Sequence, residues 1–334
     1  MALRSPQVKR LGRIALFAAI YTYALILFGG IVRITGSGMG CGDHWPKCNG
    51  VWIPEFTLET LIEYTHRALA AGIGLVVLAV VVYALANRGR PGIGGKGGLL
   101  RPILLGAVLV VVQALLGAVT VKLEIPPGVV VVHFMTALLF ASTLLVAAVR
   151  AGTLGGGTAA ANASGANPRR AWRMAFVTLL FGFVLITLGA MTANVAGAPQ
   201  ACQGFPLCNN SLAPPPGSGG PAHIHFTHRM VAYLFTLHIL MASLAARRRA
   251  VSVATKRAAA VALIAVIVQI CVAAIMVLSH LPPHWQSLHL ATGAAIWFAL
   301  VVWAALARRD LQAEEAGSGD RAGLAELDPA LAKG

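Results

Sequence analysis

Long apolar stretches, each about the length of a membrane crossing, alternate along the chain with short segments that carry most of its charged residues. A helix needs about 20 apolar residues to cross the hydrocarbon core of a bilayer. The pattern therefore predicts eight transmembrane helices. Their expected ranges are 12–33, 64–86, 102–122, 128–149, 172–193, 226–246, 258–279 and 286–307.

The composition agrees with this prediction. The chain of 334 residues is 57% hydrophobic and only 11% charged, with a mean hydropathy of +0.76, whereas soluble proteins contain about 25% charged residues. The sequence therefore predicts an all-α polytopic membrane protein. The net charge of +15 does not indicate a nucleic-acid partner, because basic residues of membrane proteins concentrate in cytoplasmic loops.

The basic residues predict how the helices are oriented. With the N-terminus in the cytoplasm, all but five of the 26 Lys and Arg residues fall on the cytoplasmic side, and the exceptions are Arg33, Lys47, Arg67, Lys122 and Arg229. The positive-inside rule therefore places both termini in the cytoplasm. The first apolar stretch is expected to stay in the protein as a helix, because no signal-peptide cleavage site follows it.

Two segments outside the predicted helices divide the chain. Residues 151–171 are rich in Gly, Ala, Ser and Asn, and we expect a flexible cytoplasmic linker there. Residues 310–334 mix acidic residues with Gly and Ala, which predicts a disordered cytoplasmic tail. Residues 1–150 and 172–309 then form an N-terminal and a C-terminal half with four helices each.

The two halves resemble each other in sequence. The repeated elements are Gln113 and Gln269, His133 and His289, the segments 65–67 and 227–229, and a pair of cysteines in each half. Several motifs repeated in the same order indicate a duplication. Because each half has an even number of helices, both enter the membrane in the same direction. The sequence therefore predicts two tandem, pseudo-symmetric four-helix bundles.

Four histidines occupy repeated positions within about the first turn of even-numbered predicted helices: His66, His133, His228 and His289. The predicted topology places them near the extracytoplasmic face, two in each half on different helices. Two facing imidazoles can ligate a haem iron from both sides, and the lack of a C-x-x-C-H motif excludes c-type haem. Zinc fits less well, because no carboxylate or thiolate accompanies the pairs at short spacing. For any single histidine, a hydrogen bond to water or a carbonyl is the alternative.

The remaining histidines receive no functional role from the sequence: His44, His223, His225, His238, His280 and His284.

Glu63 makes the halves unequal, because its counterpart in the repeat is His225. Glu63 precedes His66 by three residues and shares its helix face, so we expect its carboxylate to point toward the group that His66 holds. A solvated glutamate near a helix start is the alternative. A carboxylate in one half alone favours an active site there and a permanent cofactor in the other half.

Two arginines directly follow two of these histidines. Arg67 and Arg229 could pair with haem propionates or extend to lipid headgroups, and Arg33 is a similar but single candidate.

Two cysteine pairs lie in corresponding predicted extracytoplasmic loops: Cys41 with Cys48, and Cys202 with Cys208. An oxidising compartment favours one disulfide within each loop. Metal binding by Cys41, His44 and Cys48 is the alternative for the first loop. Cys271, within the seventh predicted helix, is expected to be a small apolar packing residue.

Together these motifs resemble the haem A synthase family. The likeness extends over about residues 10–307. The motifs that carry it are EYTHR at 63–67, HFTHR at 225–229, the paired His133 and His289, GGIVRITGSGMGC at 29–41 and the cysteine pair in each large loop.

The resemblance implies a bacterial inner-membrane enzyme of cytochrome oxidase biogenesis. Such enzymes oxidise the C8 methyl group of haem O to the formyl group of haem A through a hydroxymethyl stage. By resemblance, His66 and His133 hold the substrate haem beside a catalytic Glu63, and His228 and His289 ligate the iron of a resident haem b.

The resemblance also implies partners: haem O, the enzyme that supplies it and an electron donor. A bundle that opens toward lipid would let the isoprenoid tail of haem O stay in hydrocarbon. A homo-oligomer is compatible with the sequence.

Two other functions account for parts of the pattern. A di-haem electron-transfer cytochrome without a substrate explains four histidines but not a carboxylate in one half alone. A transporter explains the duplication but not paired histidines at one depth.

Overall fold

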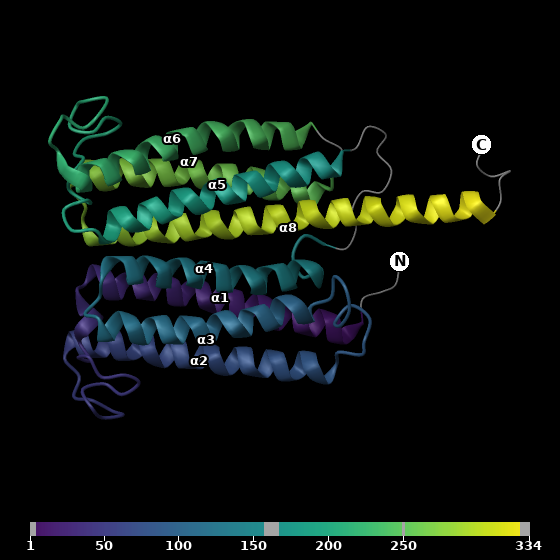
Figure 1. Ribbon diagram of the computed structural model, residues 1–334, viewed down its shortest axis with the longest axis horizontal. Helices are drawn as coiled ribbons and strands as arrows, with labels where there is room; N and C mark the ends of the chain where they lie inside the picture. The colour runs from purple at the N-terminus through teal and green to yellow at the C-terminus, as the bar shows by residue number, and fades with distance from the viewer. Residues whose placement is uncertain (1–4, 157–166, 249–250, 328–334) are drawn as a thin grey trace.

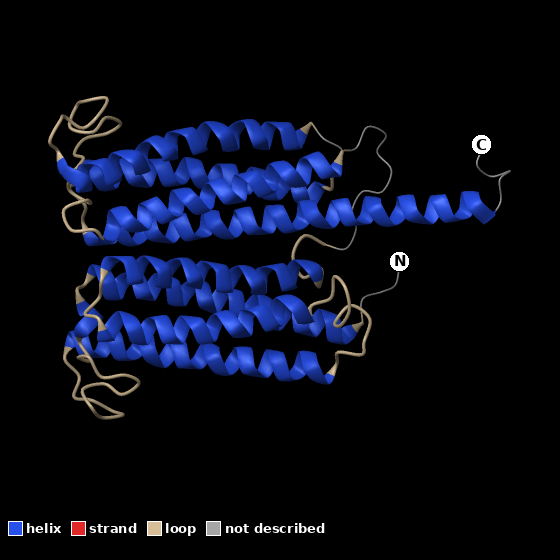
Figure 2. Cartoon of the chain, in the orientation of Figure 1, coloured by secondary structure: helices blue, strands red, loops and turns tan. Residues whose placement is uncertain are grey.

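The computed structural model describes residues 5–156, 167–248 and 251–327, and within them the chain forms eight long α-helices (Figures 1 and 2). The helices are α1 (Pro6–Ile34), α2 (Leu58–Ala86), α3 (Leu100–Lys122), α4 (Pro127–Arg150), α5 (Pro168–Asn194), α6 (Gly219–Arg247), α7 (Val253–Leu278) and α8 (Pro283–Leu327). A short 3-10 helix, η1 (Ser37–Met39), follows α1. All eight long helices are apolar enough to cross a membrane, which confirms the prediction of a polytopic helical protein.

Several helices begin earlier than the apolar pattern predicts, because their first turns are polar and start at side-chain caps. Thr57 accepts a hydrogen bond from the backbone N–H of Thr60 at the start of α2, at 3.3 Å. Such caps satisfy N–H groups that have no partner within the helix. As a result, His66 lies in the third turn of α2 rather than in the first. His228 likewise lies in the third turn of α6, which begins earlier than predicted but has no side-chain cap.

The last helix corrects one prediction. Residues 310–327, expected to be disordered, continue α8 as helix, whereas 328–334 lie outside the described residues. Ala, Leu, Glu and Gln make up most of this segment and are strong helix formers. Residues 157–166 of the predicted linker also lie outside the described residues, and α5 begins at Pro168, before the linker was expected to end.

The helices form two bundles of four that lie side by side (Figure 1). In each bundle the helices pack in chain order, and the fourth closes against the first. The bundles meet where α4 packs against α5 and α8, and where α1 packs against α8. The two large loops, 35–57 and 195–218, lie at the end of the molecule opposite the start of α1 and the end of α8.

Polar contacts tie the bundles together within this apolar interface. The indole N–H of Trp297 donates to the hydroxyl of Ser142 at 2.8 Å and lies 3.2 Å from the carbonyl of Leu138. The hydroxyl of Tyr23 on α1 donates to the carbonyl of Ala291 on α8 at 3.0 Å. Buried polar groups need such partners, so these bonds favour one relative position of the two bundles.

Candidate functional site

A cavity of about 1210 Å³ lies among the helices at the end that carries the large loops. All eight helices contribute to its wall, and all four repeated histidines line it. Glu63 is the only acidic residue among the described residues of this wall. The structure thus brings the sequence-predicted residues of both halves to one space.

The first histidine pair consists of His66 on α2 and His133 on α4, which both line the cavity. The Nδ1 atoms of both rings are buried and have no hydrogen-bond partner among the described residues. Gly29 on α1 gives His66 its room, since a Cβ there would stand 3.2 Å from Cε1 of the ring. Gln113 on α3 donates to the backbone carbonyl of His133 at 2.9 Å.

The second pair is built from corresponding elements. His228 on α6 and His289 on α8 both line the cavity, and a Cβ at Gly189 on α5 would stand 3.0 Å from Cε1 of His228. Gln269 on α7 donates to the backbone carbonyl of His289 at 3.0 Å. Its amide nitrogen also lies 3.1 Å from Nδ1 of the same ring.

These residues fit an iron porphyrin. Paired imidazoles on different helices are the ligand set that holds a haem iron without covalent attachment. Buried polar atoms without partners are costly, so the unpartnered Nδ1 atoms of His66, His133 and His228 indicate sites that are completed by a ligand. Glycine beside His66 and His228 leaves space where any other side chain would touch the ring.

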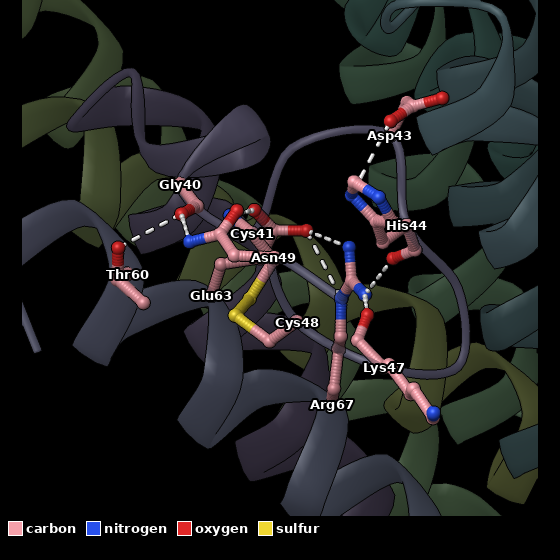
Figure 3. A network of polar contacts seen from close by, with 10 residues as sticks. All are labelled: Gly40, Cys41, Asp43, His44, Lys47, Cys48, Asn49, Thr60, Glu63 and Arg67. Atoms are coloured by element: carbon pink, nitrogen blue, oxygen red, sulfur yellow. Dashed lines mark hydrogen bonds and ion pairs between the residues drawn. A yellow bond between two sulfur atoms is a disulfide. The ribbon is translucent and has the colours of Figure 1, made fainter. Parts of the chain in front are cut away.

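Glu63 is buried, with 3% of its surface exposed, which rules out the solvated glutamate considered from the sequence. One carboxylate oxygen accepts a hydrogen bond from the backbone N–H of Cys41 at 2.8 Å. The other accepts from Nε of Arg67 at 3.0 Å and forms an ion pair with its Nη2 (Figure 3). Glu63 therefore lines the cavity and also anchors the first large loop to α2.

Arg67 completes this anchor. Its Nη1 donates to the backbone carbonyls of His44 at 2.6 Å and Lys47 at 2.9 Å (Figure 3). Four of the five N–H groups that an arginine carries are therefore used by Glu63 and the loop.

Arg229 holds the second large loop in a similar way. Its Nη1 donates to the carbonyls of Gly204 and Leu207, both at 2.9 Å, and its Nη2 donates to the carbonyl of Cys202 at 2.7 Å. Its Nε donates to Nε2 of His225 at 3.2 Å. Because Arg67 and Arg229 each keep one N–H, neither has a bidentate fork free for a propionate.

The structure gives His225 a role that sequence reasoning did not assign. Its Nδ1 donates to the carbonyl of Ala198 at 2.8 Å, while its Nε2 accepts from Arg229. This pattern requires the neutral imidazole. The arginine of the first loop is thus balanced by the charge of Glu63, whereas Arg229 has an uncharged partner. Alignment of the halves points to this position, but the contact with Ala198 is visible only in three dimensions.

Arg33 at the end of α1 differs from the other two arginines. Its Nη1 donates to the carbonyl of Ala193 on α5 at 2.9 Å, across the interface between the bundles. It lines the cavity, and no ion pair within the described part of the chain includes it.

The cysteines pair within each loop, as predicted. The Cα atoms are 4.4 Å apart in Cys41–Cys48 and 4.6 Å apart in Cys202–Cys208, within the range for disulfides. The first disulfide removes the thiolates that a metal at Cys41, His44 and Cys48 would need. Over the ranges that the structure describes, no group of three or more His, Cys, Asp or Glu side chains is arranged to hold a metal ion.

Cys271 corrects another expectation. It is exposed on the surface of α7 rather than packed within the bundle. It lies two residues after the cavity-lining Gln269, and two residues turn a helix by about 200°, so its side chain points away from the cavity.

We expect Cys271 to be the one cysteine that reacts with an alkylating reagent in protein unfolded without reductant. Iodoacetamide should then add one group per chain, and five after reduction, as counted by mass spectrometry of the intact protein. Cys271→Ala is the matched control and should give none before reduction and four afterwards. More than one modified cysteine in unreduced wild-type protein would contradict the two disulfides.

Comparison with known proteins identifies the family. Residues 12–301 match the family model COX15-CtaA, described as cytochrome oxidase assembly protein. The chain is 32% identical over 301 residues to the "Heme A synthase" of Symbiobacterium thermophilum, covering 87% of this chain and 93% of that protein. It is 29% identical over 238 residues to the "Heme A synthase" of Exiguobacterium sibiricum, covering 68% of this chain and 73% of that protein.

A shorter match involves a protein with another name. Over 119 residues the chain is 40% identical to the "Protoheme IX farnesyltransferase" of Thermus thermophilus, which covers 35% of this chain and 18% of that protein. The match to the family model, by contrast, extends over most of the chain. The chain therefore belongs to the COX15-CtaA family of cytochrome oxidase assembly proteins.

Proposed function

We propose that the protein is a haem A synthase, which oxidises the C8 methyl group of haem O to a formyl group through a hydroxymethyl stage. The observation that carries this proposal is the pair of two-histidine sites on one cavity, with a buried carboxylate beside the first pair alone. A di-haem cytochrome without a substrate does not by itself call for a carboxylate in one half alone. The relatives named heme A synthase support the same function.

In this proposal each half has its own task. His66 and His133 hold the iron of the substrate haem O, and His228 and His289 ligate a resident haem b. The resident haem, when bound, supplies one-electron chemistry. Gln113 and Gln269 fix the helices that carry the second histidine of each pair, through the backbone bonds described above.

Glu63 is the residue we assign to the chemistry. Its carboxylate either accepts a proton from the substrate as the methyl group is oxidised or stabilises positive charge that develops near that group. The amide of Cys41 and the guanidinium of Arg67 hold the carboxylate in one orientation. The side chain therefore does not have to change rotamer before it acts on the substrate.

Arg33 is better suited to a propionate than Arg67 or Arg229. It has one hydrogen bond to a carbonyl, from its Nη1, and no carboxylate partner within the described part of the chain. A guanidinium that lines a cavity and keeps several N–H groups can bind a carboxylate in a bidentate manner.

We place the protein in the bacterial plasma membrane, with both termini in the cytoplasm and the histidines and disulfides toward the extracytoplasmic side. The distribution of basic residues supports this orientation, and so do two disulfides at the end of the bundles opposite the termini. The enzyme that supplies haem O and an electron donor are the proposed partners. The match to a farnesyltransferase supports the first of these.

Expression in cells that make haem O but not haem A tests the function. We expect haem A or hydroxylated haem O in extracts of these cells, identified by mass, and haem B bound to the purified protein. Cells that carry the empty vector are the control. Haem O alone in the extract, with two haems bound to a folded protein, would instead identify an electron-transfer cytochrome and overturn the proposal.

A further inference from the structure

The repeat lets the walls of the two halves be compared position by position. α2 and α6 align without a gap through His66 and His228, and α3 and α7 align through Gln113 and Gln269. All four helices contribute to the cavity. A difference in side-chain size between aligned positions is therefore a difference in the space beside each histidine pair.

On α2, small residues line the cavity where α6 carries larger ones. Ala71 aligns with Tyr233 and Gly74 aligns with Thr236, and all four line the cavity. The hydroxyl of Tyr233 donates to the carbonyl of Pro206 at 2.6 Å, which fixes this ring at the wall of the second half. The first half has more room on this side.

α3 differs from α7 in the same direction. Ala114 and Thr120 line the cavity, and their counterparts on α7 are the larger Ile270 and Met276, which also line it. Two neighbouring helices of the first bundle thus present smaller side chains to the cavity than their counterparts do.

In the first half the cavity also reaches the outer surface of α3. Val111 and Leu115 line the cavity and yet are 59% and 58% exposed. Their counterparts Ile267 and Cys271 are exposed but do not line the cavity. The cavity therefore has an apolar opening between α2 and α3, on a surface that faces lipid in a membrane.

The opposite wall shows that this space is displaced outward rather than simply enlarged. Phe134 and Phe140 of α4 line the cavity, where α8 has the smaller Leu290 and Ile296. Because α4 packs against the second bundle, its larger side chains fill the side near the interface. The free space of the first half consequently lies toward α2, α3 and the bilayer.

A separate observation indicates that this space belongs to a ligand site. The Nδ1 atoms of His66 and His133 and the Oε1 atom of Gln113 are buried without a hydrogen-bond partner among the described residues. All three residues line the same cavity. The opening therefore leads to buried polar groups whose missing partners a bound molecule would supply.

We infer that the first half binds the isoprenoid tail of its substrate haem in this opening, and that the second half excludes such a tail. We call the opening the tail groove and define it by Ala68, Ala71, Gly74, Val111, Ala114 and Leu115. The inference rests on the proposed function and deepens it. The groove directs the tailed haem O to the histidine pair beside Glu63, and Tyr233 and Thr236 reserve the other pair for a haem without a tail.

The test copies the second half into the first. Ala71→Tyr and Gly74→Thr should each fill the tail groove without replacing a histidine. Both variants should fold, because Ala71 is exposed and no heavy atom lies within 4 Å of a Cβ built at Gly74. The matched control is Ala79→Tyr, which makes the same change at an exposed residue of α2 that does not line the cavity.

Full-length protein is purified from cells that contain both haem B and haem O, and the extracted haems are quantified by mass. We expect the haems with an isoprenoid tail, per protein, to fall by about tenfold or more in Ala71→Tyr and Gly74→Thr, since pockets discriminate by such factors for small changes in apolar bulk. Bound haem B should stay at the wild-type level, and Ala79→Tyr should resemble wild type.

Two results would overturn the inference in distinguishable ways. Wild-type levels of tailed haem in both groove variants would show that the tail lies elsewhere and that the opening holds a lipid chain or nothing specific. No tailed haem in the wild-type protein from the same cells would overturn the proposed function itself, and the groove with it.

Discussion

His228→Ala and His289→Ala are each expected to abolish the low-spin haem b absorbance of the purified protein. Each substitution removes one of the two histidines proposed to hold the haem iron, and the low-spin b-type signal would require both imidazoles. The two residues lie on different helices of the second bundle and line one cavity. Loss of either should therefore have the same spectroscopic consequence, even though the two helices differ.

The measurement is the reduced-minus-oxidised spectrum of protein purified at matched amounts. His238→Gln is the control, because His238 also lies on α6 but bonds to Thr178 at 2.9 Å and does not line the cavity. It should keep the haem b signal. An unchanged signal in both His228→Ala and His289→Ala would remove these histidines from the haem site.

Glu63→Gln is expected to reduce the conversion of haem O by roughly 10²–10⁴-fold, the usual range for a general acid or base. The amide keeps the size of the side chain and an oxygen that can accept from Cys41, but it has no negative charge. The resident haem b should remain bound, because Glu63 lies on the other bundle from His228 and His289. Haem A and hydroxylated haem O are measured in membranes at matched protein level.

The structure makes a second role for Glu63 testable, since the same carboxylate anchors the first loop. Thr60→Val is the matched control. The Thr60 hydroxyl donates to the carbonyl of Gly40 at 2.8 Å, so valine removes another anchor of the same loop without changing a charge. We expect conversion by Thr60→Val to stay close to wild type, and alkylation of cysteines to show the first disulfide intact in both variants.

The outcomes separate the possible roles of Glu63. An equal loss in Thr60→Val and Glu63→Gln would mean that Glu63 acts through the loop, and near-normal haem A in Glu63→Gln would leave it no part in the reaction. Accumulation of hydroxylated haem O would place Glu63 in the second oxidation rather than the first.

Local sequence was enough to predict the features that depend on the bilayer and on short-range geometry. A helix must hold its own backbone hydrogen bonds in lipid, so apolar length alone predicted the eight helices. Cys41 and Cys48 are seven residues apart in one loop, so their pairing could be predicted from their spacing in the sequence. The prediction failed at the ends of helices, as at Thr57 and beyond Asp310, because polar first turns and a polar helix extension have no apolar signal.

Contacts between distant segments were decided by the tertiary structure alone. Arg67 and Arg229 were candidates for haem propionates or lipid headgroups, but loop carbonyls 20 to 27 residues away take most of their N–H groups. Those carbonyls have no partner within a helix or strand, and a buried guanidinium satisfies several of them at once. The sequence contains no sign of which carbonyls will lie within reach.

The repeated sequence motifs were enough to predict which residues correspond between the halves, including the histidine pairs and the replacement of Glu63 by His225. Which of these positions line a common cavity, and on which side the cavity opens, was decided by the packing of eight helices. Ala71 and Tyr233 occupy aligned positions in the repeated sequence. They become a difference in available space only because neighbouring helices place both at the wall of one cavity, where the volume of a side chain determines what can bind.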